Sequence, residues 1–142
     1  MHRYRVVLFL SAVLTLGLSA CNSPTEPAGV DTLQVLDLVV GAGAEAVGGK
    51  TLTVNYTGWL YDRNAPENKG QVFDSSAGKT PFTFVLGTGF VIKGWDQGLV
   101  GMRVGGRRRL TIPPHLGYGA QGYGPIPPDS SLVFEVELLS VT

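Results

Sequence analysis

Val91-Ile92-Lys93-Gly94-Trp95-Asp96-Gln97-Gly98-Leu99 decides the fold of this chain, because it lies in the one segment with a helical pattern. Its large apolar side chains recur at four-residue spacing and therefore share one face of a helix. Gly94 and Gly98 interrupt the pattern, and each weakens a helix by about 1 kcal/mol relative to alanine. A short helix over residues 90–100 therefore needs a closely packed partner or a site to line.

The patterns outside this segment are those of β-strands with one apolar face. Leucine, valine and tyrosine alternate with threonine and asparagine over residues 51–60, and residues 132–139 alternate in a similar way. Further strands are predicted at residues 33–40, 82–86 and 107–112. Because one helix accompanies several antiparallel strands, we predict an α+β fold in which a curved antiparallel β-sheet wraps around one short α-helix. Two long connections rich in glycine and proline, residues 61–71 and 115–130, are candidates for function.

The charge of the chain gives no electrostatic reason to bind nucleic acid. The formal net charge is zero, and loss of Arg3 and Arg5 with a signal peptide would leave the mature chain slightly acidic. The only basic run, Arg107-Arg108-Arg109, lies in a strand pattern, where neighbouring side chains face opposite ways. We therefore interpret these arginines as solvated or locally paired. Residues 31–142 have the length of one domain, which we expect to be a monomer.

The N-terminus predicts an export signal over residues 1–20. A basic start precedes an apolar run over residues 6–18, which is shorter than the ~20 residues that cross a bilayer. The segment Leu18-Ser19-Ala20-Cys21 resembles the bacterial lipobox, which implies lipidation of Cys21 and cleavage before it. An ordinary signal peptide is the alternative.

Cys21 is the only cysteine, so an intrachain disulfide is impossible and lipidation gives this residue a use. Several acyl chains on one residue hold a protein stably at a membrane, because each buried CH₂ contributes about 0.8 kcal/mol. Residues 21–30 are polar, contain prolines and glycine, and are predicted to be a flexible tether. We expect the protein at the bacterial cell envelope. Asn22, by resemblance to other lipoproteins, favours the outer membrane facing the periplasm over the inner membrane.

Seven motifs in residues 54–139 together carry a resemblance to a known family. In chain order they are Val54-Asn55-Tyr56-Thr57-Gly58, Val72-Phe73-Asp74-Ser75-Ser76, Pro81-Phe82-Thr83-Phe84-Val85-Leu86-Gly87, Val91-Ile92-Lys93-Gly94-Trp95, Gly117-Tyr118-Gly119-Ala120, Ile126-Pro127-Pro128 and Leu132-Val133-Phe134-Glu135-Val136-Glu137-Leu138-Leu139. In this order they resemble the FKBP-type peptidyl-prolyl cis-trans isomerases over nearly the whole domain. The resemblance implies an FKBP-like fold and acceleration of Xaa-Pro isomerisation during the folding of exported proteins.

By this resemblance, apolar residues form a proline pocket with Trp95 as its floor and Phe73 and Ile126 completing its rim. The remaining residues that line this pocket are Tyr56, Phe82, Val91, Ile92 and Phe134. Asp74 and Tyr118 hold the catalytic polar positions. Tyr118 would donate a hydrogen bond to a substrate carbonyl, and the backbone N–H of Ile92 would be a further donor. Asp74 would hydrogen-bond to the strained amide or orient it electrostatically.

The expected partners are proline-containing polypeptide segments and macrolide inhibitors of the rapamycin and tacrolimus type. No metal or organic cofactor is implied. Rotation about the C–N bond has a barrier of about 18–20 kcal/mol, because the amide loses resonance as it twists. A pocket rich in aromatic side chains and poor in acids and bases suits this reaction, because the twisted amide has less charge separation and rotation transfers no obligatory proton.

The same residues have ordinary structural alternatives. Aromatic side chains at regular spacing usually form a core, Asp74 before two serines is a candidate turn or cap residue, and Tyr118 between glycines is a candidate loop aromatic. For the whole chain, the alternatives are a non-catalytic proline-peptide-binding module or chaperone of the same fold, and a structural surface lipoprotein. The presence of every pocket residue favours the enzyme.

Two departures from the smallest family members concern the approach to the pocket. The connection over residues 61–71 is longer than their short turn, so we expect a different approach to Phe73 and Asp74. In the second long connection, Tyr123 stands about where small members often carry a histidine or a small residue, and Pro125 lies two residues further on. We expect both residues to alter the choice of residue before proline.

Overall fold

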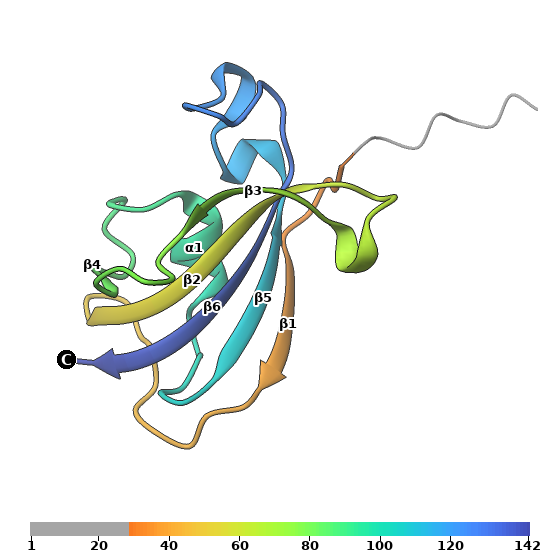
Figure 1. The fold of residues 1–142 in the computed structure, drawn as a ribbon. Coiled ribbons are helices and arrows are strands. Elements are labelled where there is room, and N and C mark those ends of the chain that lie inside the picture. The colour runs from red at the N-terminus through yellow and green to blue at the C-terminus, as the bar shows by residue number, and fades with distance from the viewer. Residues whose placement is uncertain (1–28) are drawn as a thin grey trace, which may run out of the picture.

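The computed structural model describes residues 29–142, so the predicted signal peptide, Cys21 and most of the predicted tether lie outside the described part of the chain. Within it, six strands form one antiparallel sheet: β1 (Gln34–Val39), β2 (Thr51–Tyr61), β3 (Lys69–Ser75), β4 (Phe82–Val85), β5 (Arg107–Ile112) and β6 (Leu132–Val141). The strand order is β1-β5-β6-β2-β3, and β4 also pairs with β2. The sheet curves around one short helix, α1 (Lys93–Gly98), which confirms the predicted fold class (Figure 1).

The two glycines of α1 let the helix lie directly on the sheet. A Cβ atom at Gly94 would be 2.6 Å from Cγ2 of Ile112, and one at Gly98 would be 2.7 Å from Cδ2 of Leu110. Both distances are far below van der Waals contact, so alanine does not fit unless the Ile112 or Leu110 side chain, or the strand that carries them, moves. The glycines that weaken the helical pattern are therefore required by its packing partner.

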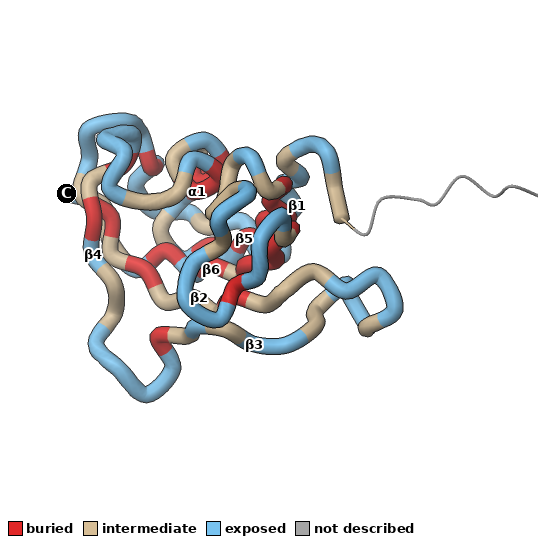
Figure 2. The backbone as a smooth tube through the Cα atoms, turned by 90° about the horizontal axis from the view of Figure 1, so that it is seen from above, coloured by how far each residue is buried: buried red, intermediate tan, exposed pale blue. Residues whose placement is uncertain are grey.

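The core lies between α1 and the sheet (Figure 2). Leu132, Phe134, Val136 and Leu138 alternate along β6 and are buried, as their spacing predicts. Trp95 and Leu99 pack against them from the helix side and are 4% and 0% exposed. In contrast, all six residues of β1 are exposed, so this edge strand contributes little to the core.

Strand β2 changes its neighbour along one edge, and this change positions Tyr56. Residues 51–54 of β2 pair with β4, whereas residues 57–61 pair with β3. Between the two segments, the backbone of Tyr56 bonds to Ser76, which accepts from the Tyr56 N–H through Oγ and donates its own N–H to the Tyr56 carbonyl, both at 2.9 Å. The sheet therefore separates into β3 and β4 on either side of Tyr56.

The structure corrects the prediction that residues 61–71 form one long loop. Strand β3 already begins at Lys69, and a 3-10 turn over Pro66–Asn68 forms the last part of the remaining connection, residues 62–68. The pairing of β2 with β3 contains register irregularities next to Trp59. An irregular edge strand lacks a clean two-residue apolar period, which is why the sequence pattern did not predict it. The second long connection stays free of strands and contains two 3-10 turns, Pro114–Leu116 and Gly119–Gln121.

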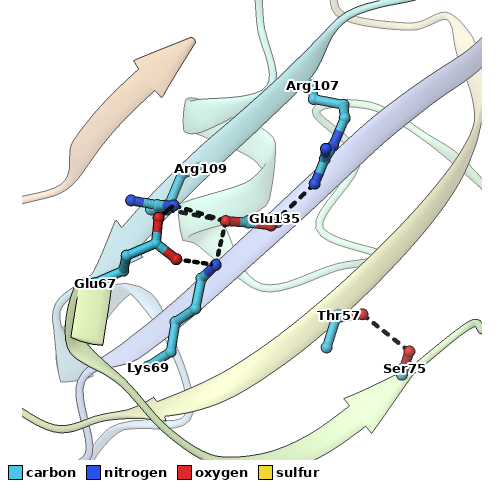
Figure 3. A network of polar contacts seen from close by, with 7 residues as sticks. All are labelled: Thr57, Glu67, Lys69, Ser75, Arg107, Arg109 and Glu135. Carbon is cyan, nitrogen blue, oxygen red and sulfur yellow. Dashed lines mark hydrogen bonds and ion pairs between the residues drawn. The ribbon is translucent and has the colours of Figure 1, made fainter. Parts of the chain in front are cut away.

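The three consecutive arginines of β5 are locally paired. Arg107 and Arg109 point to the face of the sheet away from α1, where both contact Glu135 of β6 (Figure 3). Glu135 also accepts from Lys69 at 2.6 Å, so this carboxylate joins three strands. Arg108 points to the other face, is 8% exposed, and pairs with Asp37. No single basic surface results.

Candidate functional site

A cleft of about 520 Å³ opens where β3 and β4 part on either side of Tyr56. It is bounded by the start of α1 and by residues of the connection between β5 and β6. The residues that line it are Tyr56, Phe73, Asp74, Phe82, Gly89, Phe90, Val91, Ile92, Trp95, Tyr118, Tyr123 and Phe134. Most of these side chains are apolar or aromatic, and Asp74 is the only carboxylate among them.

The indole of Trp95 is the centre of an aromatic cluster around this cleft. Its ring lies 5.2 Å from that of Tyr56 and 5.3 Å from that of Phe134, and both pairs meet edge to face. Edge-to-face contacts of this kind stabilise aromatic pairs beyond the area that they bury. Nε1 of Trp95 is buried and has no hydrogen-bond partner among the described residues. The cluster therefore fixes an apolar surface at the base of the cleft.

Asp74 lies at the rim, held in place by two hydrogen bonds. The hydroxyl of Tyr56 donates to Oδ2 at 2.6 Å, and the backbone N–H of Ser75 donates to Oδ1 at 2.8 Å. Burial, together with the hydrogen bond to Asp74 and its charge, raises the pKa of the Tyr56 hydroxyl well above its usual value. Tyr56 therefore stays protonated at neutral pH and keeps the carboxylate in one orientation. No helix begins directly after Asp74, because β3 continues to Ser75 and the next element is β4, so the bond from Asp74 to Ser75 is not a helix cap.

Tyr118 contributes a second hydroxyl from the connection between β5 and β6. Its ring stacks on that of Tyr123, with centroids 5.2 Å apart and planes at 14°. Burial raises the pKa of Tyr118, and the nearby charge of Asp74 adds to the effect. At neutral pH the hydroxyl is therefore a hydrogen-bond donor.

Ile92 brings a backbone donor to the same cleft. It is the residue before α1, and its carbonyl accepts the N–H groups of Trp95 and Asp96. Its own N–H has no acceptor among residues 29–142. The cleft is therefore lined by an apolar surface, a carboxylate, and hydroxyl and amide donors.

All of the predicted pocket and catalytic residues except Ile126 line this cleft, whereas the predicted lipidation site, Cys21, lies outside the described residues. Ile126 is 4% exposed and belongs to the core. Ile126 is absent from the cleft because the chain makes a tight reversal, in which the backbones of Tyr123 and Ile126 exchange two hydrogen bonds of 3.0 and 2.9 Å. This reversal directs Ile126 inward and leaves Tyr123 exposed at the cleft.

Phe90 lines the cleft but was not among the predicted site residues. It lies at the edge of the helical segment, where helical periodicity places no requirement on its side chain. Its position directly before Val91 was the one available signal. Gly89 is a second lining residue that the sequence pattern did not identify.

A second hollow, of about 560 Å³, lies on the face of the sheet away from α1. Its lining is polar and includes Thr57, Arg107 and Glu137. It is slightly larger than the aromatic cleft but contains none of the predicted site residues apart from Tyr56.

Within residues 29–142, no group of His, Cys, Asp and Glu is arranged to hold a metal ion, and no helix is long and apolar enough to span a membrane.

Comparison with known proteins agrees with the geometry. The family model described as FKBP-type peptidyl-prolyl cis-trans isomerase matches residues 43–139. A protein named FK506-binding protein from Neisseria meningitidis serogroup A is 55% identical over 112 residues, which are 78% of this chain and 96% of that protein. The peptidyl-prolyl cis-trans isomerase FKBP15-3 of Arabidopsis thaliana is 53% identical over 79% of this chain and 76% of its own length.

Among solved structures, the crystal structure of AtFKBP13 superposes with a TM-score of 0.68. It is 44% identical in sequence, and the match covers 78% of this chain and 93% of that one. The family model, the relatives and the fold agree over the same domain. The chain therefore belongs to the FKBP-type peptidyl-prolyl cis-trans isomerases.

Proposed function

We propose that this protein accelerates Xaa-Pro isomerisation in exported polypeptides by binding the twisted amide in the cleft above Trp95. The observation that carries the proposal is the composition of this cleft. The cleft has an aromatic surface on which the substrate's proline ring would lie. Asp74, Tyr118 and the N–H of Ile92 are polar groups at the edge of this surface. The lining contains no cysteine, serine or histidine that would act as a nucleophile.

The physical basis is differential binding of the twisted amide. A planar amide is polarised, and it is stabilised by water more than the twisted form, in which resonance is lost. An apolar cleft removes this water and so lowers the barrier, with about 1.36 kcal/mol of preference for each tenfold in rate. Trp95 and its neighbouring rings supply the apolar surface.

The polar groups hold the substrate in the orientation that twisting requires. Tyr118 donates to one carbonyl of the peptide, and the N–H of Ile92 donates to another. Asp74 accepts from Tyr56 and Ser75, and a carboxylate is an acceptor only. Its negative charge therefore acts on the amide electrostatically. The carbonyl oxygen of a planar amide carries a partial negative charge, so the Asp74 carboxylate repels it. Twisting the amide reduces this charge, and the repulsion therefore favours the twisted form.

We further propose that Cys21 is lipidated and holds the monomeric domain at the bacterial envelope, at the outer membrane facing the periplasm. The support is the signal pattern, the lipobox resemblance and the absence of any other cysteine in the sequence. Replacement of Cys21 by serine is expected to abolish incorporation of labelled fatty acid. Continued incorporation into the variant would overturn the lipid anchor and leave the isomerase proposal untouched.

The isomerase proposal is tested by exchange NMR on an Xaa-Pro peptide with the full-length protein. We expect faster cis-trans exchange, and we expect rapamycin or tacrolimus to compete with the peptide. Macrolide binding without acceleration would instead support a non-catalytic binding module of the same fold. The aromatic cleft and the full set of polar groups favour the enzyme over that alternative.

A further inference from the structure

Phe90 is a large aromatic side chain that the core does not use. It is 69% exposed, and the next two residues, Val91 and Ile92, are half-buried. Its ring nevertheless stacks on that of Phe82, with centroids 6.4 Å apart and planes at 20°. Phe82 stacks in turn on Phe84 at 5.5 Å and 22°. The three rings form one column that runs from the core to the mouth of the cleft.

The turn before Phe90 is fixed from the side of the helix. The carboxylate of Asp96 accepts the N–H of Gly87 at 2.8 Å and the N–H of Gly89 at 3.0 Å. Both glycines have positive φ angles, of 82° and 75°, which other residues adopt only with strain. Thr88 donates its hydroxyl to the carbonyl of Val85 at 2.9 Å. The backbone that leads into Phe90 is therefore fixed by these bonds, and the stacking on Phe82 orients its ring, which lowers the entropy cost of using Phe90 in binding.

A small hollow of about 280 Å³ lies beside Phe90, next to β4. Its lining residues are Thr51, Thr83, Phe84, Val85, Thr88 and Phe90, none of which is ionisable. Phe90 lines this hollow and also the proline cleft, so the two share one wall. A polypeptide seated in the cleft can therefore continue into the hollow. An extended chain advances about 3.3 Å per residue, so a side chain within a few residues of the proline reaches it.

We propose that Phe90 and this hollow form a second subsite, which binds an apolar side chain of the polypeptide whose proline occupies the cleft. The subsite rests on the proposed isomerase function. Its occupant is apolar because the hollow offers phenyl, methyl and hydroxyl groups and no charge that would pair with an ionised side chain. Tyr123 lines the cleft from a different connection, the one between β5 and β6, and does not line this hollow.

The test is a peptide series in which one phenylalanine is moved through the positions before and after proline in an otherwise alanine-rich sequence. The kcat/KM of the full-length protein is measured for each peptide. For each position, the ratio is the kcat/KM of the peptide with phenylalanine at that position divided by that of the peptide with alanine at the same position. We expect one position that is not the residue directly before proline to give a ratio of about three to ten, the effect of one aromatic contact. Lysine or aspartate at that position is expected to give no gain.

Substitutions in the protein then assign this preference to Phe90. Phe90→Ser is expected to bring the ratio to about one, because the stacking partner is lost. Phe90→Leu is expected to restore part of it. Tyr123→Ser is expected to leave the ratio at the preferred position unchanged. Val100→Ser removes another exposed apolar side chain and serves as the control for a general surface effect.

Two outcomes overturn the subsite. They are equal ratios at all positions and a preferred position that persists in Phe90→Ser. Each of them requires that the wild-type protein accelerates exchange in the alanine-rich peptide. Failure of the wild-type protein to accelerate any peptide of the series contradicts the proposed isomerase function itself, so the two failures are distinguishable.

Discussion

The hydroxyl of Tyr56 donates a 2.6 Å hydrogen bond to Oδ2 of Asp74, across the point where β2 changes its neighbour from β4 to β3. This bond joins an aromatic residue of the cleft to the carboxylate at its rim. Because Tyr56 also meets Trp95 edge to face, the orientation of Asp74 depends on the same packing that forms the apolar surface. The electrostatic and apolar parts of the site are therefore coupled through one side chain.

Tyr56→Phe and Asp74→Ala are expected to lower catalysis more than stability. Tyr56→Phe keeps the ring and removes the donor, so we expect kcat/KM to fall about three- to tenfold with at most about 1 kcal/mol lost from the free energy of unfolding. Asp74→Ala removes the charge and should lower kcat/KM further. Exchange NMR and urea denaturation measure the two quantities. Equal losses of activity and stability would instead mark Asp74 as a structural residue.

Gly94→Ala is expected to destabilise the protein although alanine is the better helix former. The added Cβ atom would lie 2.6 Å from Cγ2 of Ile112, and overpacking of this kind costs about 1–3 kcal/mol. This exceeds the gain of about 1 kcal/mol in helix propensity. The matched control is Gly48→Ala, because no atom lies within 4 Å of a Cβ built there. Denaturation curves in which both variants are equally stable would contradict the close packing of α1 on β5.

Arg108→Met is expected to cost about 2–4 kcal/mol of unfolding free energy, whereas Arg107→Met should cost less than about 1 kcal/mol. The buried guanidinium of Arg108 donates to Asp37 and to the carbonyls of Gly98 and Val100, so it joins β1 and the end of α1 to β5. Arg107 is exposed and contacts Glu135 at 3.1 Å. Similar thermal and chemical stabilities of the two variants would show that the contacts of the buried Arg108 do not stabilise the fold.

Glu135 is expected to make stability depend on pH in the acid range. Burial alone would raise its pKa, but hydrogen bonds from Lys69 and Arg109 outweigh burial and lower the pKa below its usual value. The stabilising contribution is therefore complete above the ordinary glutamate pKa of about 4.3 and is lost as the pH falls through the lower pKa of the folded state.

The variant Glu135→Gln should consequently lose about 1–3 kcal/mol at pH 7 and show a weaker decline in stability below about pH 4.5. Glu137→Gln, on the same face of β6, is the control, because no ion pair of Glu137 occurs in the described part of the chain. Denaturation at a series of pH values compares the three proteins. If stability declines below pH 4.5 as steeply in Glu135→Gln as in the wild-type protein, the role assigned to the ion pairs of Glu135 is contradicted.

The elements that the sequence predicted are those with a regular apolar period. The alternation in β2 and β6 and the four-residue spacing around Trp95 arise from the burial of one face, which local sequence records directly. The position of β5 was predicted without error, and β1, β4 and β6 differ from prediction by one or two residues at their ends. Nearly the whole cleft followed from the resemblance, because its residues lie in ordered motifs.

The elements that the sequence did not predict depend on partners that are distant in the chain. Strand β3 is an irregular edge strand, so its pairing with β2 rather than its own pattern defines it. Ile126 is directed inward by a chain reversal that begins at Tyr123, which no periodicity encodes. The place of Phe90 at the cleft depends on Asp96, which fixes the turn before it from the neighbouring helix.

The sequence alone therefore predicted one short helix, interrupted by two glycines, and a curved antiparallel sheet around it, and it showed the resemblance to the FKBP-type isomerases. Only the tertiary structure decided that Tyr56 orients Asp74, that Glu135 joins three strands, and that Phe90 connects the cleft to a second hollow. The physical reason is the range of the interactions. Burial of one face leaves a period in the local sequence, whereas hydrogen bonds, ion pairs and ring contacts depend on where distant segments meet.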